Sequence, residues 1–109
     1  VAGGLATSKS IQMKPPLLGI SLTGQKKVAS TGVAVQLPTN ALLNGVIITA
    51  LSTNSAAICL GGAGVQNLTD GTGNGYILEA GASTSFALTN TNLLYINGTS
   101  GDVVSFAGS

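Results

Sequence analysis

The chain has 109 residues, enough for one domain with one hydrophobic core but too few for two. Charged residues make up only 6% of it, whereas they make up about a quarter of a typical domain, and the net charge is +1. This leaves too few positive charges for electrostatic binding to nucleic acid, and the longest clean apolar run, Val46 to Leu51, is too short to span a membrane. We therefore expect neither nucleic acid nor membrane as a partner.

Residues 1–19 differ in character from the rest. They hold two of the four lysines and a proline pair, and they show no sustained apolar period, which indicates an extended N-terminal arm before a single domain over residues 20–109. Within the arm, apolar and polar residues alternate briefly, as in a strand that pairs with a partner's sheet edge. A disordered terminus is the alternative, and we expect no secretory leader. The candidate contact residues are Lys9, Ile11, Met13, Lys14, Pro15 and Pro16.

From Ile20 onward, short alternating segments predict strands. Residues 20–23 and the stretch around residues 26–30 are the first two, and residues 32–38 the next. In this third segment Val33, Val35 and Leu37 share one face, and Pro38 ends it.

The segment at residues 45–52 is apolar on both faces. Val46 and Ile48 point one way, while Ile47 and Leu51 point the other way. Such a pattern predicts a strand that is covered on both sides.

The remaining strands follow at near-regular spacing, at residues 56–62, 76–81, 83–88, 93–97 and 102–107. Alternation directs Val104 and Phe106 inward. The last two strands read as a hairpin, in which Asn97, Gly98 and Gly101 supply the positive φ that the turn needs. About eight short strands predict an all-β fold, a single antiparallel β-sandwich of jelly-roll type, with a small barrel as the alternative.

Residues 61–75 form the longest loop and the natural place for a ligand. Its glycine spacing is similar to that of phosphate-binding loops, but no helical pattern follows it. Asp70 and Glu79 are too few acidic side chains for a calcium site, so we predict no metal and no cofactor. The better interpretation is a flexible surface loop that touches a neighbouring subunit. Its candidate contact residues are Gln66, Asn67, Asp70 and Asn74.

The residue types of enzymatic sites are largely missing. Cys59, the single cysteine, lies in an apolar segment. The chain has no histidine, so it lacks the usual base that activates a cysteine or a serine as a nucleophile. Paired carboxylates for glycoside hydrolysis would have to come from only three acidic residues. We predict a buried structural cysteine and a protein that is not an enzyme.

The exterior of the folded chain must be unusually neutral. With 44% apolar and 6% charged residues, its surface consists mainly of small polar and small apolar side chains, and its edge strands lack protective lysines. Few surface charges favour association. We therefore expect a permanent homo-oligomer or a subunit of a larger lattice.

Three motifs follow one another between Asn44 and Phe106. The first is a GG-x-x-V turn and the second is L-x-x-G-x-S-x-x-F, and the stretch closes with a motif that contains G-x-x-G-D-x-V-x-F. Their positions are Gly61, Gly62 and Val65, then Leu78, Gly81, Ser83 and Phe86, then Leu93, Tyr95, Gly98, Gly101, Asp102, Val104 and Phe106. In this order of motifs the stretch resembles small β-sandwich virion proteins of tailed bacteriophages. The loop between Val65 and Tyr76 is longer here, and the arm before Ile20 has no counterpart.

The resemblance implies a non-enzymatic capsid decoration or cement protein, made in the bacterial cytoplasm and located on the capsid surface of the virion. Its partners would be the major capsid protein and other copies of itself, as a homotrimer. The alternative is a tail, fibre or head-fibre module that binds host surface glycan, with Tyr76 and Tyr95 as stacking groups.

Overall fold

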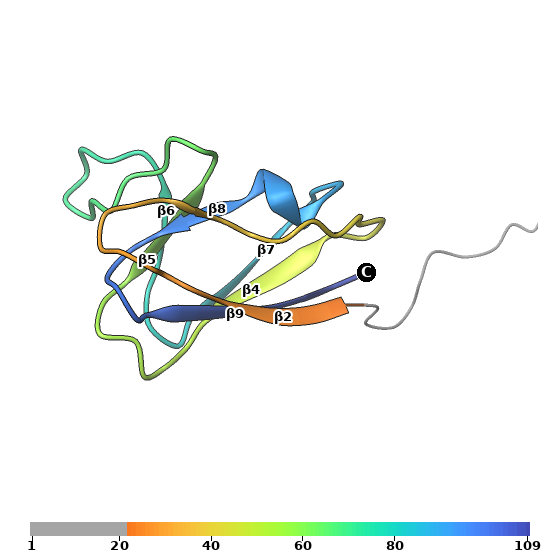
Figure 1. Ribbon diagram of the computed structural model, residues 1–109, viewed down its shortest axis with the longest axis horizontal. Coiled ribbons are helices and arrows are strands. Elements are labelled where there is room, and N and C mark those ends of the chain that lie inside the picture. Colours follow the sequence, from red (N-terminus) through yellow and green to blue (C-terminus); the bar gives the residue numbers. More distant parts are fainter. Residues whose placement is uncertain (1–21) are drawn as a thin grey trace, which may run out of the picture.

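A computed structural model of the chain describes residues 22–109, which fold into two antiparallel four-stranded sheets packed face to face (Figure 1). In spatial order, the first sheet consists of β2 (Leu22–Lys27), β9 (Val103–Gly108), β4 (Val46–Ala50) and β7 (Ser83–Phe86). The second consists of β3 (Val35–Gln36), β8 (Tyr95–Asn97), β5 (Ile58–Gly61) and β6 (Tyr76–Leu78). A 3₁₀ turn, η2 (Thr91–Leu93), precedes β8. The predicted all-β sandwich is confirmed, whereas the arm at residues 1–19 lies outside the described residues.

The core lies between the two sheets, where alternate side chains from each sheet meet. Ile48 of β4 and Phe106 of β9 are register partners on the inner face of the first sheet. Leu60 of β5 and Ile96 of β8 are partners on the inner face of the second. All four are buried, and Val104 is buried with them, so the inward direction predicted for Val104 and Phe106 is confirmed.

The first predicted strands differ in the structure. In place of separate strands at residues 20–23 and 26–30, one strand, β2, runs from Leu22 to Lys27, and all six of its residues pair with β9. β3 has only two residues, and Val33 before it is 56% exposed. Leu37 is buried as predicted. The long β9 explains the first difference, because it offers an unbroken partner for the whole segment.

β4 is not covered on both sides. Its burial alternates, with Val46, Ile48 and Ala50 facing the core and Ile47 54% exposed on the outer face. The continuous apolar run therefore misled the prediction, because a residue as apolar as Ile47 can face solvent when its neighbours are inward. Within the described residues, no second layer covers the outer face of this sheet.

The turn between β8 and β9 also differs from the prediction. Gly101 has a positive φ of 92°, but Gly98 is not among the positive-φ glycines, and the turn closes with a bond from the amide of Asp102 to the carbonyl of Thr99. Asn97 ends β8 and is buried. Its side-chain nitrogen donates to the carbonyls of Gly32 (3.2 Å) and Val65 (3.0 Å), so it joins two loops.

Candidate interaction surfaces

The described residues contain no group of three or more histidine, cysteine or acidic side chains that could hold a metal ion. Within the same range, no helix has the length and apolarity needed to cross a membrane.

Asp102 is buried and holds the loop between β4 and β5. Its carboxylate accepts bonds from the amide of Ser55 (2.9 Å), the hydroxyl of Ser55 (3.0 Å) and the amide of Ala56 (3.2 Å). Beside it, the side chain of Asn54 exchanges two hydrogen bonds of 2.9 Å with the backbone of Val103. These bonds give Asp102 a structural role, because they hold the loop between β4 and β5 in place.

Cys59 is fully buried in β5, as predicted. Its Sγ lies 3.6 Å from the carbonyl oxygen of Leu68. Burial raises the pKa of the thiol, and the contact with Leu68 only partly opposes this. The thiol therefore stays protonated, which suits a packing residue rather than a nucleophile.

The long loop covers the outer face of the second sheet. Asn97 and Cys59 lie on this outer face, yet both are buried, because the loop folds over them. Val65, only 4% exposed, packs against Gly61 and Gly75 beneath the loop. A β-carbon at Gly75 would lie 2.7 Å from Cγ2 of Val65, so only glycine fits there. The loop is thus a structural cover for this sheet.

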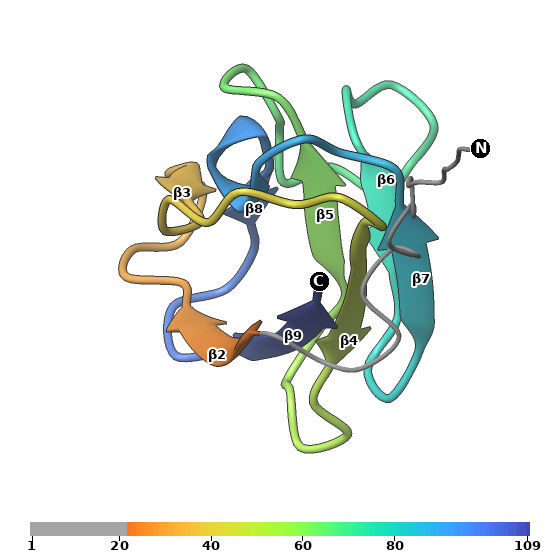
Figure 2. The same ribbon diagram turned by 90° about the vertical axis from the view of Figure 1, so that its right-hand side faces the viewer.

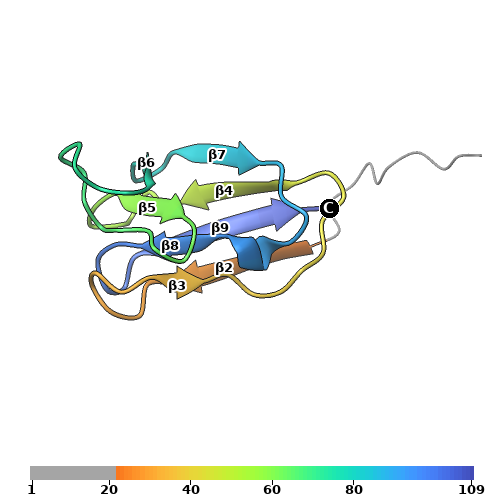
Figure 3. The same ribbon diagram turned by 90° about the horizontal axis from the view of Figure 1, so that it is seen from above.

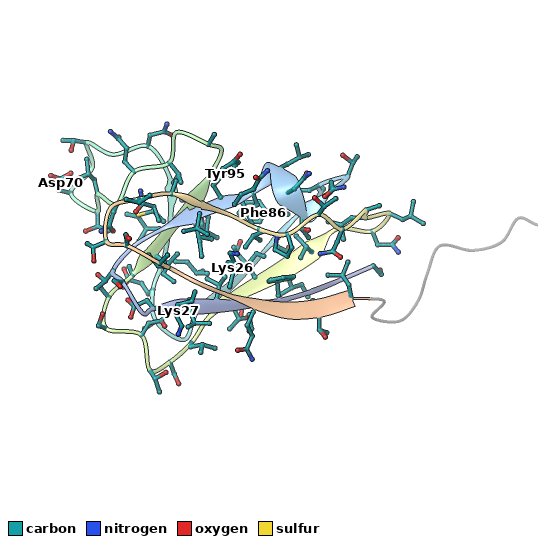
Figure 4. The ribbon with its side chains drawn as sticks, viewed as in Figure 1. Lys26, Lys27, Asp70, Phe86 and Tyr95 are labelled. Atoms are coloured by element: carbon teal, nitrogen blue, oxygen red, sulfur yellow. The ribbon has the colours of Figure 1, made fainter. Side chains whose placement is uncertain are left out.

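The four loop residues predicted as contacts lie on this cover. A backbone bond of 2.9 Å from Gln66 to Asn74 joins two of them, and both are exposed. Asn67 is half-buried, and Asp70 is exposed at a separate turn, where its carboxylate accepts from the amide (3.0 Å) and hydroxyl (2.6 Å) of Thr72. Figure 4 shows Asp70 at one end of the molecule. The predicted arm contacts lie outside the described residues.

The two tyrosines do not form a shared platform. Tyr76 pairs with the buried Leu60 at the sheet edge and stands edge-on to the ring of Phe86, with centroids 6.4 Å apart. Tyr95 pairs with Gly61 and Gln36 on the outer face of the same sheet. Their side chains thus leave the sheet on opposite faces.

No segment of residues 22–109 covers the outer face of the first sheet, which carries mainly neutral side chains. Register and alternating burial place six of its neutral side chains on the central strands and the β7 edge: Ile47 and Thr49 of β4, Ser105 and Ala107 of β9, and Ser83 and Ser85 of β7. The hydroxyls of Thr49 and Ser83 lie 2.7 Å apart. Lys27 is the one charged outward side chain among the described strands of this face. Figure 3 shows the four strands lying side by side as one layer.

Ile47 stands between two hollows of this face. One, of about 440 Å³, lies between β4 and β7 and is lined by Ser85 and Ala87, and the other, of about 380 Å³, lies over β9 beside Gln25. Ile47 and Ala107 line both. An isolated apolar side chain flanked by hollows is a shape that a complementary surface can engage. The sequence did not reveal this site, because Ile47 stands in an apolar run that predicted a strand covered on both sides.

The open edges of the first sheet differ in charge. Edge strand β2 carries Lys26 and Lys27, so the expectation that edge strands lack lysines is wrong for this edge. The opposite edge strand, β7, has no charged residue, and Glu79 precedes it. Figure 2 shows β2 beside β3 on one side of the sandwich and β7 beside β6 on the other.

Comparison with known proteins gives no match: no family model, no curated protein and no solved structure matches this chain.

Proposed function

We propose that this chain is a non-enzymatic structural protein of a tailed-bacteriophage virion, a decoration or cement protein that binds the outside of the head shell and stabilises it. The major capsid protein is its partner, and the capsid surface is its location after synthesis in the bacterial cytoplasm. The resemblance of residues 44–106 to small virion proteins suggests this role, and the open face of the first sheet supports it.

The single observation that carries the proposal is the neutral outer face around Ile47. The centres of protein interfaces are depleted in charged residues, and this face presents hydroxyl and methyl groups with one apolar side chain between two hollows. Its small side chains also lose little rotamer freedom when they are covered. A shell subunit with a neutral surface that receives Ile47 and fills the two hollows is the occupant that this chemistry fits.

Binding on the shell stabilises it by mass action. A ligand that binds only assembled subunits shifts the equilibrium toward assembly, by about 2.7 kcal/mol per site when its free concentration is a hundred times its dissociation constant. Many weak sites on one shell add together. In this proposal residues 1–19 extend across neighbouring shell subunits, with Ile11 and Met13 as apolar anchors and Lys9 and Lys14 meeting acidic groups.

Binding to purified heads that lack the protein tests the face. Ile47→Glu places a charge at its centre, and we expect an affinity at least about tenfold lower, because a buried unpaired charge costs more than 1.4 kcal/mol. Val33→Glu is the matched control, since Val33 is similarly exposed, at 56%, but lies outside this face. Urea unfolding checks that both variants are folded. Equal binding of Ile47→Glu and the parent chain would contradict the proposal, and so would a parent chain that binds no head.

Deleting residues 1–19 tests the arm separately. We expect the truncated chain to remain folded and to lose binding to heads. Unchanged binding would show that residues 1–19 do not contribute to binding, and the outer face around Ile47 would then be the contact with the head.

A further inference from the structure

Among residues 22–109, the sheet β2-β9-β4-β7 ends in two edge strands, β2 and β7, whose outward peptide groups pair with no further strand. The amide of Val28 donates to Asp102 (2.8 Å) and the carbonyl of Val28 accepts from Gly101 (2.9 Å), so the peptide groups at position 28 face β9. Because peptide groups alternate along a strand, those of Thr23, Gln25 and Lys27 face away from β9.

The other edge follows the same logic. The amide of Ala50 donates to the carbonyl of Ala82 (3.0 Å), so this carbonyl faces β4. The peptide groups of Ser83 and Ser85 therefore point away from β4, toward the open side of β7. In the part of the chain that the structure describes, β7 has no second partner strand.

The two edge strands run in opposite directions, and their residues fall in the same rows across the sheet, so they suit antiparallel pairing. β2 and β4 both pair antiparallel with β9, and β7 pairs antiparallel with β4, so β2 runs antiparallel to β7. One row across the sheet joins Gln25, Ser105, Thr49 and Ser83. A second copy placed alongside at the same level would therefore bring its Ser83 opposite Gln25. Both side chains would lie on the outer face, so the alternation of the sheet would continue.

The charges also match at this level. Lys26 lies in the row of Val104 and Ala50, and Ala50 bonds to Ala82. Ala82 in turn donates to the carbonyl of Glu79 (2.9 Å) in the turn before β7. Side-by-side copies would therefore bring Lys26 and Lys27 of one copy close to Glu79 of the next. Pairing of β2 with another β2 would offer the lysines no acidic partner, because β2 carries none.

We propose that this chain self-associates head to tail, with β2 of one copy adding to the β7 edge of a second copy. Backbone hydrogen bonds supply the affinity, while the lysines and Glu79 select direction and register. Such a contact is heterologous, and the twist of the sheet rotates each copy against the last, so the assembly closes into a ring if the rotation permits. The inference deepens the proposed function and rests on its homo-oligomeric part. It leaves the face around Ile47 free for the shell.

Charge exchange in the full chain, followed by sedimentation equilibrium without any capsid, tests the contact. We expect Glu79→Lys, and separately Lys26→Glu with Lys27→Glu, to raise the dissociation constant at least about tenfold. The triple variant, and an equimolar mixture of the two, restore association because opposite charges meet again. Asp70→Lys is the matched control, since it changes the net charge as Glu79→Lys does but lies on the loop that covers the second sheet. It should associate like the parent chain.

A backbone variant tests the edge without altering charge. Ser85→Pro removes an amide that faces the open side, so we expect loss of association in a chain whose urea unfolding stays cooperative.

Association unchanged in Glu79→Lys and in the double lysine variant would overturn the proposal, as would a parent chain that stays monomeric at high concentration. A monomer that still binds heads would overturn this contact and leave the proposed function standing. Charge-dependent self-association in a chain that binds no head would support the contact and contradict the decoration role.

Discussion

Gly24 and Phe106 are register partners across the β2–β9 pair, and the ring of Phe106 occupies the space of the missing side chain of Gly24. A β-carbon at position 24 would lie 2.6 Å from Cζ and 3.0 Å from Cε2 of this ring. Phe106 itself is buried and faces Ile48 on its other side. An aromatic ring over a glycine in an edge strand restores the apolar cover that the glycine lacks. The glycine in β2 is therefore a packing requirement of the core.

Gly24→Ala should lower the free energy of unfolding by about 1–3 kcal/mol, because the added methyl group displaces a buried ring. Gly62→Ala is the control, since a β-carbon at position 62 would meet nothing within 4 Å, and it should change stability by less than about 0.5 kcal/mol. Urea unfolding of the two alanine variants, alone and combined with Phe106→Leu, measures the coupling energy between each glycine position and Phe106. We expect Phe106→Leu to cost less in the alanine background. Purely additive effects would contradict the contact.

Asp102 should contribute more to stability than either of the other acidic residues. Asp102→Ala leaves the amides of Ser55 and Ala56 without their acceptor, and we expect a loss of about 3 kcal/mol. Asp102→Asn keeps one oxygen acceptor and should cost less. Asp70→Ala, at an exposed turn, should cost less than about 0.5 kcal/mol. The urea midpoints of unfolding rank the three variants. If the Asp102→Ala chain were as stable as the Asp70→Ala chain, the carboxylate of Asp102 would not stabilise the fold.

The strand content of this chain was predictable because alternation and turn residues are local signals. The segments around Val104 and Phe106 are clear examples, since their neighbours alternate in polarity and the sheet keeps that order. Ile47 was not predictable in the same way, because a run of apolar residues does not say which face has a second layer above it. That depends on where distant strands and loops lie.

The cover over the second sheet illustrates the same limit. Composition identifies residues 61–75 as a loop, but it does not reveal that Val65 and Leu68 fold back onto Asn97 and Cys59. Similarly, Lys26 and Lys27 are visible as a pair in the sequence, and only the strand order shows that they lie on an edge. Of the predicted contacts, Gln66 and Asn74 lie side by side on this cover, whereas Asp70 lies at a separate turn with Thr72.

The cover also predicts how Cys59 reacts. A buried thiol of raised pKa should react with a disulfide reagent at least about a hundredfold more slowly in the folded chain than in urea, since reaction requires opening. Val65→Ala loosens the cover above Cys59 and should speed the reaction. Val35→Ala, in the distant edge strand β3, is the matched control and should not. Equal acceleration by both would mean that global unfolding, and not opening of the loop, exposes the thiol.

The turn at Asp70 makes a prediction about pH. The hydroxyl and then the amide of Thr72 donate to Asp70 and hold its pKa below the usual value. Because the pKa is lower in the folded chain, the contribution of this group to stability is present above the unfolded pKa. It is lost as pH falls through the folded pKa. Thr72→Val removes the hydroxyl, so the pKa of Asp70 should rise toward its ordinary value, whereas Thr69→Val should leave it where it is. Titration of the Asp70 carboxyl carbon by NMR measures both, and an unchanged pKa in Thr72→Val would show that the hydroxyl does not hold the charge.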